Sequence, residues 1–379
     1  MAQRPRAETV GSLLRTPPVL RAARRNSLAD QAVLDDAALD AIRLQEEAGL
    51  DVITDGEVRR GGWVQTPRWL DAFAVTEGRG ALHWRGGAGL STATTPSAAD
   101  GGERAHGTAQ YGGGYPAVVR RVSQARRTGD MTAEYAFLVR HSQTPTKFTM
   151  PAPSYHRRFW SSGHSAAAYG SCEEYLTEIR DWLRAEVATL VALGCDYIQL
   201  DAPNYGSYCD PGARARLERD GFDIDAQVAF DAELDNSLFE GMTGITTALH
   251  VCRGNGPRGR WHSAGGYGAI SRTLFPRLEF SRLLLEYDSD RAGGFEPLAD
   301  VRAGTVVVLG LLTTKSDGLE DQAAIASKIA EATAVKPLDE LALSTQCGFA
   351  SAPGENPVTP AGQRAKLELV ALLARQTWG

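Results

Sequence analysis

The chain has no apolar run that approaches the ~20 residues a membrane-spanning helix needs, although 43% of its 379 residues are hydrophobic. Its formal net charge of −6 provides no general attraction to nucleic acid or to an anionic membrane. The first residues lack the apolar core of a secretory signal. We therefore expect a cytoplasmic protein that binds neither nucleic acid nor membrane, and a homo-oligomer is left open.

Cysteine is also scarce. The five cysteines are an odd number and lack the regular spacing of a disulfide framework. A reducing compartment explains them better than disulfide pairing does. Cys195, which precedes a predicted strand, is most simply a buried thiol.

Eight short β-runs alternate with helical patterns along the chain, which is typical of an α/β fold with a parallel sheet. We predict a single (β/α)₈ TIM barrel over residues 1–379. The strands are expected at Glu8–Ser12, Asp51–Asp55, Lys147–Pro151, Tyr197–Asp201, Thr246–Cys252, Arg282–Asp288, Thr305–Leu312 and Leu341–Cys347. Helices are expected at Ala37–Leu50, Cys172–Leu193, Asp225–Phe239, Leu319–Ala334 and Thr359–Thr377.

A glycine-rich insertion interrupts this pattern between the second and third strands, at about residues 76–140. Val118–Val122 and Tyr135–Val139 are expected to be extra strands outside the barrel. The insertion is either a solvated excursion or a loop that shapes the catalytic face. It begins at the carboxyl end of the second strand, which is the correct face for the second role.

Four potential metal ligands stand at the ends of the apolar runs: His250, Cys252, Glu286 and Cys347. Alternation along a strand places residues i and i+2 on one face, so His250 and Cys252 can bind the same ion. Two thiolates, one imidazole and one carboxylate suit tetrahedral Zn²⁺. Each cysteine alone would more simply be a buried thiol, and a lone Asp at a strand end a helix cap. Their common position at the same end of the strands favours a metal site.

A zinc ion with two thiolate ligands is a weak Lewis acid, because its ligands have already neutralised its charge. Such an ion is poorly suited to making hydroxide from water. It can instead hold a substrate thiol as a nucleophilic thiolate near neutral pH, where a free thiol of pKa about 8.5 is mostly protonated. The predicted reaction class is therefore alkyl transfer to sulfur.

The chain resembles cobalamin-independent methionine synthase, specifically its C-terminal catalytic barrel and the short stand-alone relatives of that barrel. The resemblance covers nearly the whole length, and the ordered His-x-Cys, Glu and Cys elements are its most specific part. It is carried by the segments Val10–Arg15, Asp51–Glu57, Ile198–Asp201, His250–Asn255, Leu285–Asp288 and Gln346–Phe349.

The resemblance implies a zinc-dependent methyltransferase that activates homocysteine or a similar aminothiol. His250, Cys252, Glu286 and Cys347 match the zinc-ligand positions. Ser12 matches the residue that holds the substrate carboxylate. Glu57 and Asp201 match the catalytic carboxylates that hold the ammonium group. Methyltetrahydrofolate is the family's methyl donor, and Trp160 is a candidate to stack on its pterin.

The sequence departs from the family pattern at several points. The second, N-terminal barrel of the full-length enzyme is not matched. The family's catalytic histidine is missing from the end of the seventh strand, where Lys315 is a weak substitute. Thr9 stands where short relatives usually carry a histidine. The general acid and the methyl donor are therefore unassigned.

Alternatives follow from these departures. The short relatives include epoxyalkane:coenzyme M transferases, in which a zinc thiolate opens an epoxide. A second alternative is a methyltransferase with a non-folate donor. A third is an accessory protein that delivers a thiol or methyl group to a partner. A sulfonate on the thiol would favour arginines at the pocket mouth, whereas Glu57 and Asp201 would repel it. The available arginines are Arg15, Arg59, Arg60, Arg157, Arg158 and Arg253.

Overall fold

A computed structural model describes residues 5–25, 27–76, 85, 115–352 and 356–379. Seven parallel strands form one curled sheet in the order β1-β9-β8-β7-β6-β5-β4. The strands are β1 (Ala7–Glu8), β4 (Phe148–Pro151), β5 (Tyr197–Asp201), β6 (Thr246–Val251), β7 (Arg282–Glu286), β8 (Val306–Leu312) and β9 (Leu341–Thr345).

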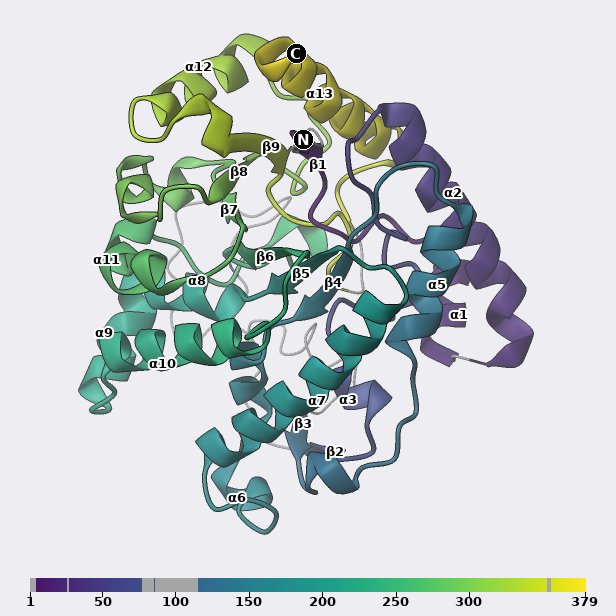
Figure 1. The fold of residues 1–379 in the computed structure, drawn as a ribbon, viewed down its shortest axis with the longest axis vertical. Coiled ribbons are helices and arrows are strands. Elements are labelled where there is room, and N and C mark those ends of the chain that lie inside the picture. The colour runs from purple at the N-terminus through teal and green to yellow at the C-terminus, as the bar shows by residue number, and fades with distance from the viewer. Residues whose placement is uncertain (1–4, 26, 77–84, 86–114, 353–355) are drawn as a thin grey trace.

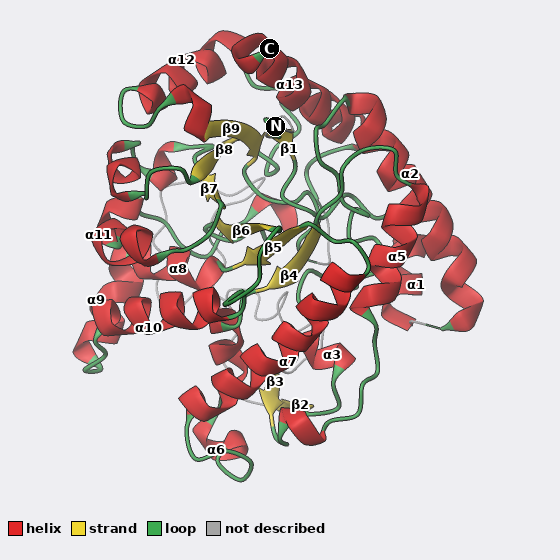
Figure 2. Cartoon of the chain, viewed as in Figure 1, coloured by secondary structure: helices red, strands yellow, loops and turns green. Residues whose placement is uncertain are grey.

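The two edges of this sheet are joined through residues 52–53. Val52 makes a parallel bridge with Glu8 of β1, and Ile53 makes one with Thr146, which lies shortly before β4. Helices surround the curled sheet on its outside (Figures 1 and 2). The architecture is thus a TIM-like α/β barrel, and the predicted α/β class is confirmed. The second predicted strand, Asp51–Asp55, is reduced to these two bridges.

The helices are α1 (Pro17–Arg25), α2 (Gln31–Ala48), α3 (Thr66–Trp69), α5 (Met131–His141), α6 (Ser162–Ser165), α7 (Cys172–Ala192), α8 (Pro203–Cys209), α9 (Pro211–Arg219), α10 (Ile224–Ser237), α11 (Ser271–Leu274), α12 (Gln322–Thr333) and α13 (Pro360–Trp378). Side-chain caps fix where several of them begin. Ser171 accepts a hydrogen bond from the Glu174 amide at the start of α7, and Thr359 accepts one from Gly362 at the start of α13.

The strands carry charged as well as apolar side chains into the protein interior. Glu8 of β1 is fully buried and pairs with Lys147 at 2.6 Å and with Arg282 of β7 at 2.7 Å. Burial raises the pKa of Glu8, but the two cations outweigh it and leave the pKa below its ordinary value. Since removing one member of such a buried group would strand the others, the cluster fixes how β1, β4 and β7 fit together.

The insertion between the second and third barrel positions differs from expectation where it is described. Much of the glycine-rich segment lies outside the described residues. Its flanks, β2 (Phe73–Thr76) and β3 (Tyr115–Val118), form an antiparallel pair. The extra strand expected at Val118–Val122 is therefore shifted toward the N-terminus.

The second extra strand, Tyr135–Val139, is wrong because these residues belong to α5. Asp130 caps that helix by accepting from the Thr132 amide. Its buried residues are Met131, Glu134, Tyr135 and Leu138, and this spacing is typical of a helix, not of an alternating strand. Among the helices that the structure describes, none has the length and hydropathy to span a bilayer.

Candidate metal centre and adjoining pocket

A pocket of about 280 Å³ opens at the carboxyl ends of the barrel strands. Ser12, which follows β1, Asp201 at the end of β5, His250 in β6 and Cys347 after β9 all line it. The parallel register places Asp201 directly opposite His250. Barrel active sites occupy this end of the strands, so the pocket is the natural place for chemistry.

Three predicted metal ligands meet in this pocket. The ligand atoms of His250, Cys252 and Cys347 lie within 4.8 Å of one another, and all three side chains are buried. His250 Nδ1 lies 3.1 Å from the Leu284 carbonyl oxygen. His250 Nε2 is buried and has no hydrogen-bond partner among the described residues. A proton on Nδ1 that is donated to the carbonyl leaves the Nε2 lone pair available as a ligand.

Local chain geometry brings the cluster together. His250 and Cys252 are two residues apart at the end of β6, so both side chains lie on the same side. Helix α8 passes close to this strand end, because a Cβ at Gly206 would lie only 2.0 Å from the Cys252 carbonyl oxygen. Gly206 therefore allows a helix–strand approach that any other residue would block.

The electrostatics of the cluster favour a thiolate. Interaction with the Cys252 thiol lowers the pKa of Cys347 well below its usual range. The same interaction raises the pKa of Cys252. Burial lowers the pKa of His250, but the neighbouring Cys347 sulfur more than offsets this effect. Two sulfurs and one imidazole with an unpartnered nitrogen are a donor set that fits a zinc ion.

Glu286, predicted as the fourth ligand, lies differently. It ends β7 and is fully buried, but among the described residues only the other three predicted ligands form the cluster. Its Oε1 accepts a hydrogen bond from Arg291 Nη2 at 2.7 Å. Its Oε2 accepts one from the Arg253 amide at 2.8 Å. Both carboxylate oxygens are thus engaged by donors of the chain itself.

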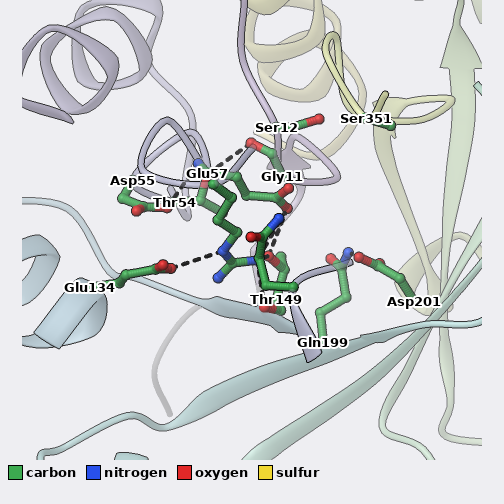
Figure 3. A network of polar contacts seen from close by, with 12 residues as sticks. Gly11, Ser12, Thr54, Asp55, Glu57, Glu134, Thr149, Gln199, Asp201 and Ser351 are labelled. Carbon is green, nitrogen blue, oxygen red and sulfur yellow. Dashed lines mark hydrogen bonds and ion pairs between the residues drawn. The ribbon is translucent and has the colours of Figure 1, made fainter. Parts of the chain in front are cut away.

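Glu57 is a buried carboxylate on another wall of the same pocket. Its Oε1 accepts a hydrogen bond from Thr149 at 2.7 Å, whereas its Oε2 is buried without a partner among the described residues (Figure 3). Its backbone has φ of 52°, a left-handed conformation that costs a non-glycine residue about 1–3 kcal/mol. Asp55 stabilises this turn by accepting from the Glu57 amide. The chain thus bears local strain to place this carboxylate in the pocket.

Asp201 is the second carboxylate of the pocket. Gln199 donates a hydrogen bond to its Oδ1 at 2.7 Å. Burial outweighs the lowering effect of His250 and, with a contribution from Glu57, raises the pKa of Asp201 to about 7. Burial likewise raises the pKa of Glu57. Two buried carboxylates with raised pKa values form a site that a substrate cation would stabilise.

Ser12, the predicted carboxylate-binding residue, also lines the pocket and is buried. Its hydroxyl oxygen accepts a hydrogen bond from the Ala350 amide at 3.3 Å. Gly348 is required beside it, because a Cβ there would lie 2.1 Å from the Ser12 hydroxyl oxygen. Ser12 thus faces the same space as the metal cluster and the carboxylates.

A further wall of the pocket is aromatic and basic. Its arginines were among those that the sequence offered, but its aromatic side chains were not predicted. Trp63 packs on Tyr155 with ring centroids 4.6 Å apart. Arg158 Nε donates to the Tyr115 hydroxyl at 2.6 Å, so strand β3 supplies one of the side chains. His262 also lines the pocket, and burial lowers its pKa to about 3. His262 lies in a glycine-rich loop whose sequence carries no periodic signal, which is why sequence reasoning assigned it no role.

Other predicted residues lie elsewhere. Trp160 is not among the described residues that line the pocket; its ring stacks on Tyr175 of α7. His156 is fully buried and hydrogen-bonds to the Ala152 carbonyl and the Thr66 hydroxyl. Burial lowers the pKa of His156 to about 4. Its ring is therefore a structural hydrogen-bonding group.

Most of the arginines that the sequence offered for a sulfonate have structural partners. Arg15 donates to the carbonyl oxygens of Glu57 and Ala350. Arg60 donates hydrogen bonds to the Glu134 carboxylate and to the Thr149 carbonyl oxygen. Arg59 donates to Asp35, and Arg253 donates to the Gly265 carbonyl. Arg157 donates to the carboxylates of Glu173 and Asp231. Arg157 and Arg158 are the members of the set that line the pocket.

Comparison with known proteins gives two related sequences. The chain is 30% identical to the uncharacterized protein YxjH of Bacillus subtilis, over 98% of this chain and 94% of that protein. It is 29% identical to the uncharacterized protein YxjG of the same organism, with the same coverage. The chain belongs to the YxjH family. No family model matches the sequence.

The fold of this YxjH-family protein is similar to that of solved structures. A candidate vitamin-B12-independent methionine synthase from Listeria monocytogenes matches with a TM-score of 0.66 and 24% identity, over 98% of each chain. A B12-independent methionine synthase from Shewanella sp. W3-18-1, solved with selenomethionine, matches with a TM-score of 0.65 and 19% identity, over 98% of this chain and 96% of that one. At these identities the comparison shows a shared fold. The resemblance stated from the sequence is confirmed at that level.

Proposed function

We propose that this protein is a zinc-dependent, cobalamin-independent methyltransferase that methylates the thiol of homocysteine or a similar aminothiol. One observation carries the proposal: the His250, Cys252 and Cys347 cluster lines the same pocket as the buried carboxylates Glu57 and Asp201. The sulfur-rich cluster suits a metal ion that binds a substrate sulfur. The two carboxylates suit a cationic group on the same small molecule. We propose that one catalytic barrel, residues 1–379, performs the reaction.

The chain's own residues would orient the substrate. Glu57 and Asp201 would bind the ammonium group, which supplies the positive charge that two buried carboxylates favour. Ser12 and the backbone beside it would receive the carboxylate. Binding at both ends would hold the thiol beside the sulfur cluster, and orientation of this kind lowers the entropic cost of reaction.

His250, Cys252 and Cys347 would hold the zinc ion. When bound, zinc would supply stabilisation of the substrate thiol in its nucleophilic thiolate form. The hydrogen bond between His250 and the Leu284 carbonyl keeps the ring oriented toward the cluster.

The aromatic and basic wall is the proposed place for the methyl donor. Trp63 and Tyr155 offer faces on which a planar ring can stack. Arg158 also lines the pocket, and its positive charge favours an anionic donor. Methyltetrahydrofolate combines both features and is our first choice.

The structural neighbour from Shewanella sp. supports an amino-acid substrate, because that protein was solved in complex with selenomethionine. The runner-up is alkyl transfer to a sulfonate-bearing thiol such as coenzyme M, with an epoxide as the alkyl donor. Arg158 favours an anion, but the carboxylates Glu57 and Asp201 disfavour a sulfonate beside them. A methyltransferase with a non-folate donor is the other alternative.

Product analysis tests the proposal. Zinc-loaded protein is incubated with homocysteine and methyltetrahydrofolate, and in parallel with coenzyme M and a short epoxide. We expect methionine in the first reaction, its loss in Cys347→Ser, and its retention in the matched control Cys195→Ser, whose thiol is buried away from the pocket. Thioether formed from the epoxide alone would establish the runner-up. Methionine formed equally well by Cys347→Ser would overturn the metal-based account.

A further inference from the structure

The two carboxylate oxygens of Glu57 have different surroundings. Oε1 accepts a hydrogen bond from the Thr149 hydroxyl at 2.7 Å, whereas Oε2 is buried and has no hydrogen-bond partner among the described residues (Figure 3). Because Glu57 lines the pocket, Oε2 is the oxygen that remains for a ligand. A buried carboxylate oxygen without a donor is costly, so this position calls for a ligand with N–H groups.

The direction of the hydrogen bond between Thr149 and Glu57 is set by Arg60. Arg60 Nη1 donates to the Thr149 hydroxyl oxygen at 3.1 Å and to the Thr149 carbonyl oxygen at 3.0 Å. A guanidinium group has donors and no acceptor, so it cannot receive the hydroxyl proton of Thr149. That proton is therefore directed to Glu57 Oε1. The three side chains form a relay in which Arg60 donates to Thr149 and Thr149 donates to Glu57.

Arg60 is itself held on its other side. Its Nε donates to Glu134 Oε2 at 2.8 Å, and its guanidinium carbon lies 4.9 Å from the ring centroid of Phe148. The Arg60 side chain is only 2% exposed. Its Nη1 lies 3.8 Å from Glu57 Oε1, which is too long for a hydrogen bond but close enough for electrostatic attraction. Arg60 therefore fixes Thr149 and attracts Glu57 without occupying either oxygen of Glu57.

The chain makes room for this arrangement at Gly11, between β1 and Ser12. A Cβ at Gly11 would lie 2.4 Å from Glu57 Oε1 and 3.2 Å from the Thr149 methyl carbon. The Glu57 backbone is fixed as well, since Asp55 accepts from its amide at 2.9 Å and Arg15 donates to its carbonyl oxygen at 2.9 Å. With its backbone and Oε1 both held, the carboxylate has one favoured orientation.

We propose that Arg60 and Thr149 are positioning residues that turn Glu57 Oε2 toward the substrate ammonium, and so make the pocket select thiols that carry an amino group. The inference rests on the proposed function, because it concerns the substrate of that same pocket. Neither Arg60 nor Thr149 is among the described residues that line the pocket, so both act through Glu57. Without the Thr149 hydroxyl, the carboxylate can rotate toward Arg60 and pair with it, which withdraws Oε2 from the ligand.

The affinities for two thiols, one with an amino group and one without, test the proposal. Homocysteine and 4-mercaptobutyrate share the thiol, the carboxylate and the chain length, and calorimetry on the zinc-loaded protein measures both affinities. Thr149→Val replaces the hydroxyl with a methyl group of similar size. We expect this variant to bind homocysteine about tenfold more weakly, because it removes a hydrogen bond to a charged group. Its affinity for 4-mercaptobutyrate should stay within about twofold of the wild type.

Three further variants separate positioning from general stability. Thr149→Ser keeps the hydroxyl and should bind both thiols within about threefold of the wild type. Arg60→Lys keeps the charge but lacks the planar fork that reaches Thr149 and Glu134 together, so homocysteine affinity alone should fall, at least threefold. Thr146→Val is the matched control and should change neither affinity, because Thr146 is a buried threonine whose hydroxyl contacts Tyr135, away from the pocket. Circular dichroism confirms that each variant is folded.

Three results would overturn the inference. An equal loss of both affinities in Thr149→Val would give Thr149 a general structural role. Unchanged homocysteine affinity in Thr149→Val would remove the relay, and unchanged homocysteine affinity in Arg60→Lys would remove Arg60 from it. Failure of the proposed function itself is distinct, since a wild-type protein that binds homocysteine no more tightly than 4-mercaptobutyrate would have no ammonium site.

Discussion

Asp201→Asn should make the metal-free protein more stable while it weakens substrate binding. Asp201 is a buried carboxyl group in the pocket, and burial raises its pKa from 3.8 to about 7. A carboxyl with a raised pKa in the folded state stabilises less as pH rises, because the folded protein holds the proton more tightly than the unfolded chain does. The loss begins near the unfolded pKa of about 3.9 and is complete above pH 7.

The magnitude follows from the pKa difference. A shift of about 3 units at about 1.4 kcal/mol each corresponds to an upper limit of about 4 kcal/mol at pH 8. Asparagine keeps the oxygen that accepts from Gln199 and removes the charge. We therefore expect Asp201→Asn to raise the free energy of unfolding at pH 8 by up to about 4 kcal/mol. The dependence of stability on pH between 4 and 7 should shrink accordingly.

Urea unfolding of the metal-free protein at several pH values measures the change in the free energy of unfolding. Asp196→Asn, at an exposed position, is the matched control. Calorimetry on the zinc-loaded protein measures the affinity for homocysteine. Loss of one carboxylate from a buried ammonium site costs about 2–5 kcal/mol, so homocysteine affinity should fall roughly 30-fold or more. A less stable variant at pH 8, or one that binds homocysteine as tightly as the wild type, would refute the reasoning.

Three further predictions concern other parts of the structure. Burial lowers the pKa of His156 to about 4. The free energy of unfolding should therefore fall by up to about 3 kcal/mol as the pH falls from 6.5 to 4. Urea titrations should find this pH dependence reduced in His156→Gln and unchanged in His141→Gln, which replaces an exposed histidine. Gly348→Ala should raise the KM for the aminothiol at least tenfold, because its Cβ would lie 2.1 Å from the Ser12 hydroxyl, whereas Gly318→Ala, which meets no atom within 4 Å, should leave it unchanged. Arg158→Met should raise the KM for an anionic methyl donor about tenfold and leave homocysteine binding unaltered, and the opposite pattern in steady-state kinetics would contradict the assignment of that wall.

The barrel could be predicted because its strands are buried on both faces and form continuous apolar runs, such as β8 (Val306–Leu312). The second barrel position could not be delimited, because residues 52–53 make single bridges with both neighbours. The error at Tyr135–Val139 arose because a short apolar segment fits a strand or a buried helix equally well, and the Asp130 cap decides between them.

The cluster of His250, Cys252 and Cys347 could be anticipated because strand ends of a parallel barrel converge on one face. The partner of Glu286 could not be anticipated, because Arg291 lies in a single 3₁₀ turn, Asp290–Ala292, and no spacing rule relates the two residues. The aromatic side chains of the pocket wall, Trp63, Tyr115 and Tyr155, could not be predicted for a similar reason. Side chains from irregular segments meet only when the fold is complete, and their sequence carries no period.

The central claim is that the substrate thiol binds to a metal ion held by His250, Cys252 and Cys347. It is tested most directly by calorimetric titration of homocysteine into zinc-loaded protein, in buffers of different ionisation enthalpy. The account predicts binding with about one proton released per site, because a thiol must lose its proton to become a metal ligand. Binding without proton release, or no binding by a protein that contains zinc, would contradict it.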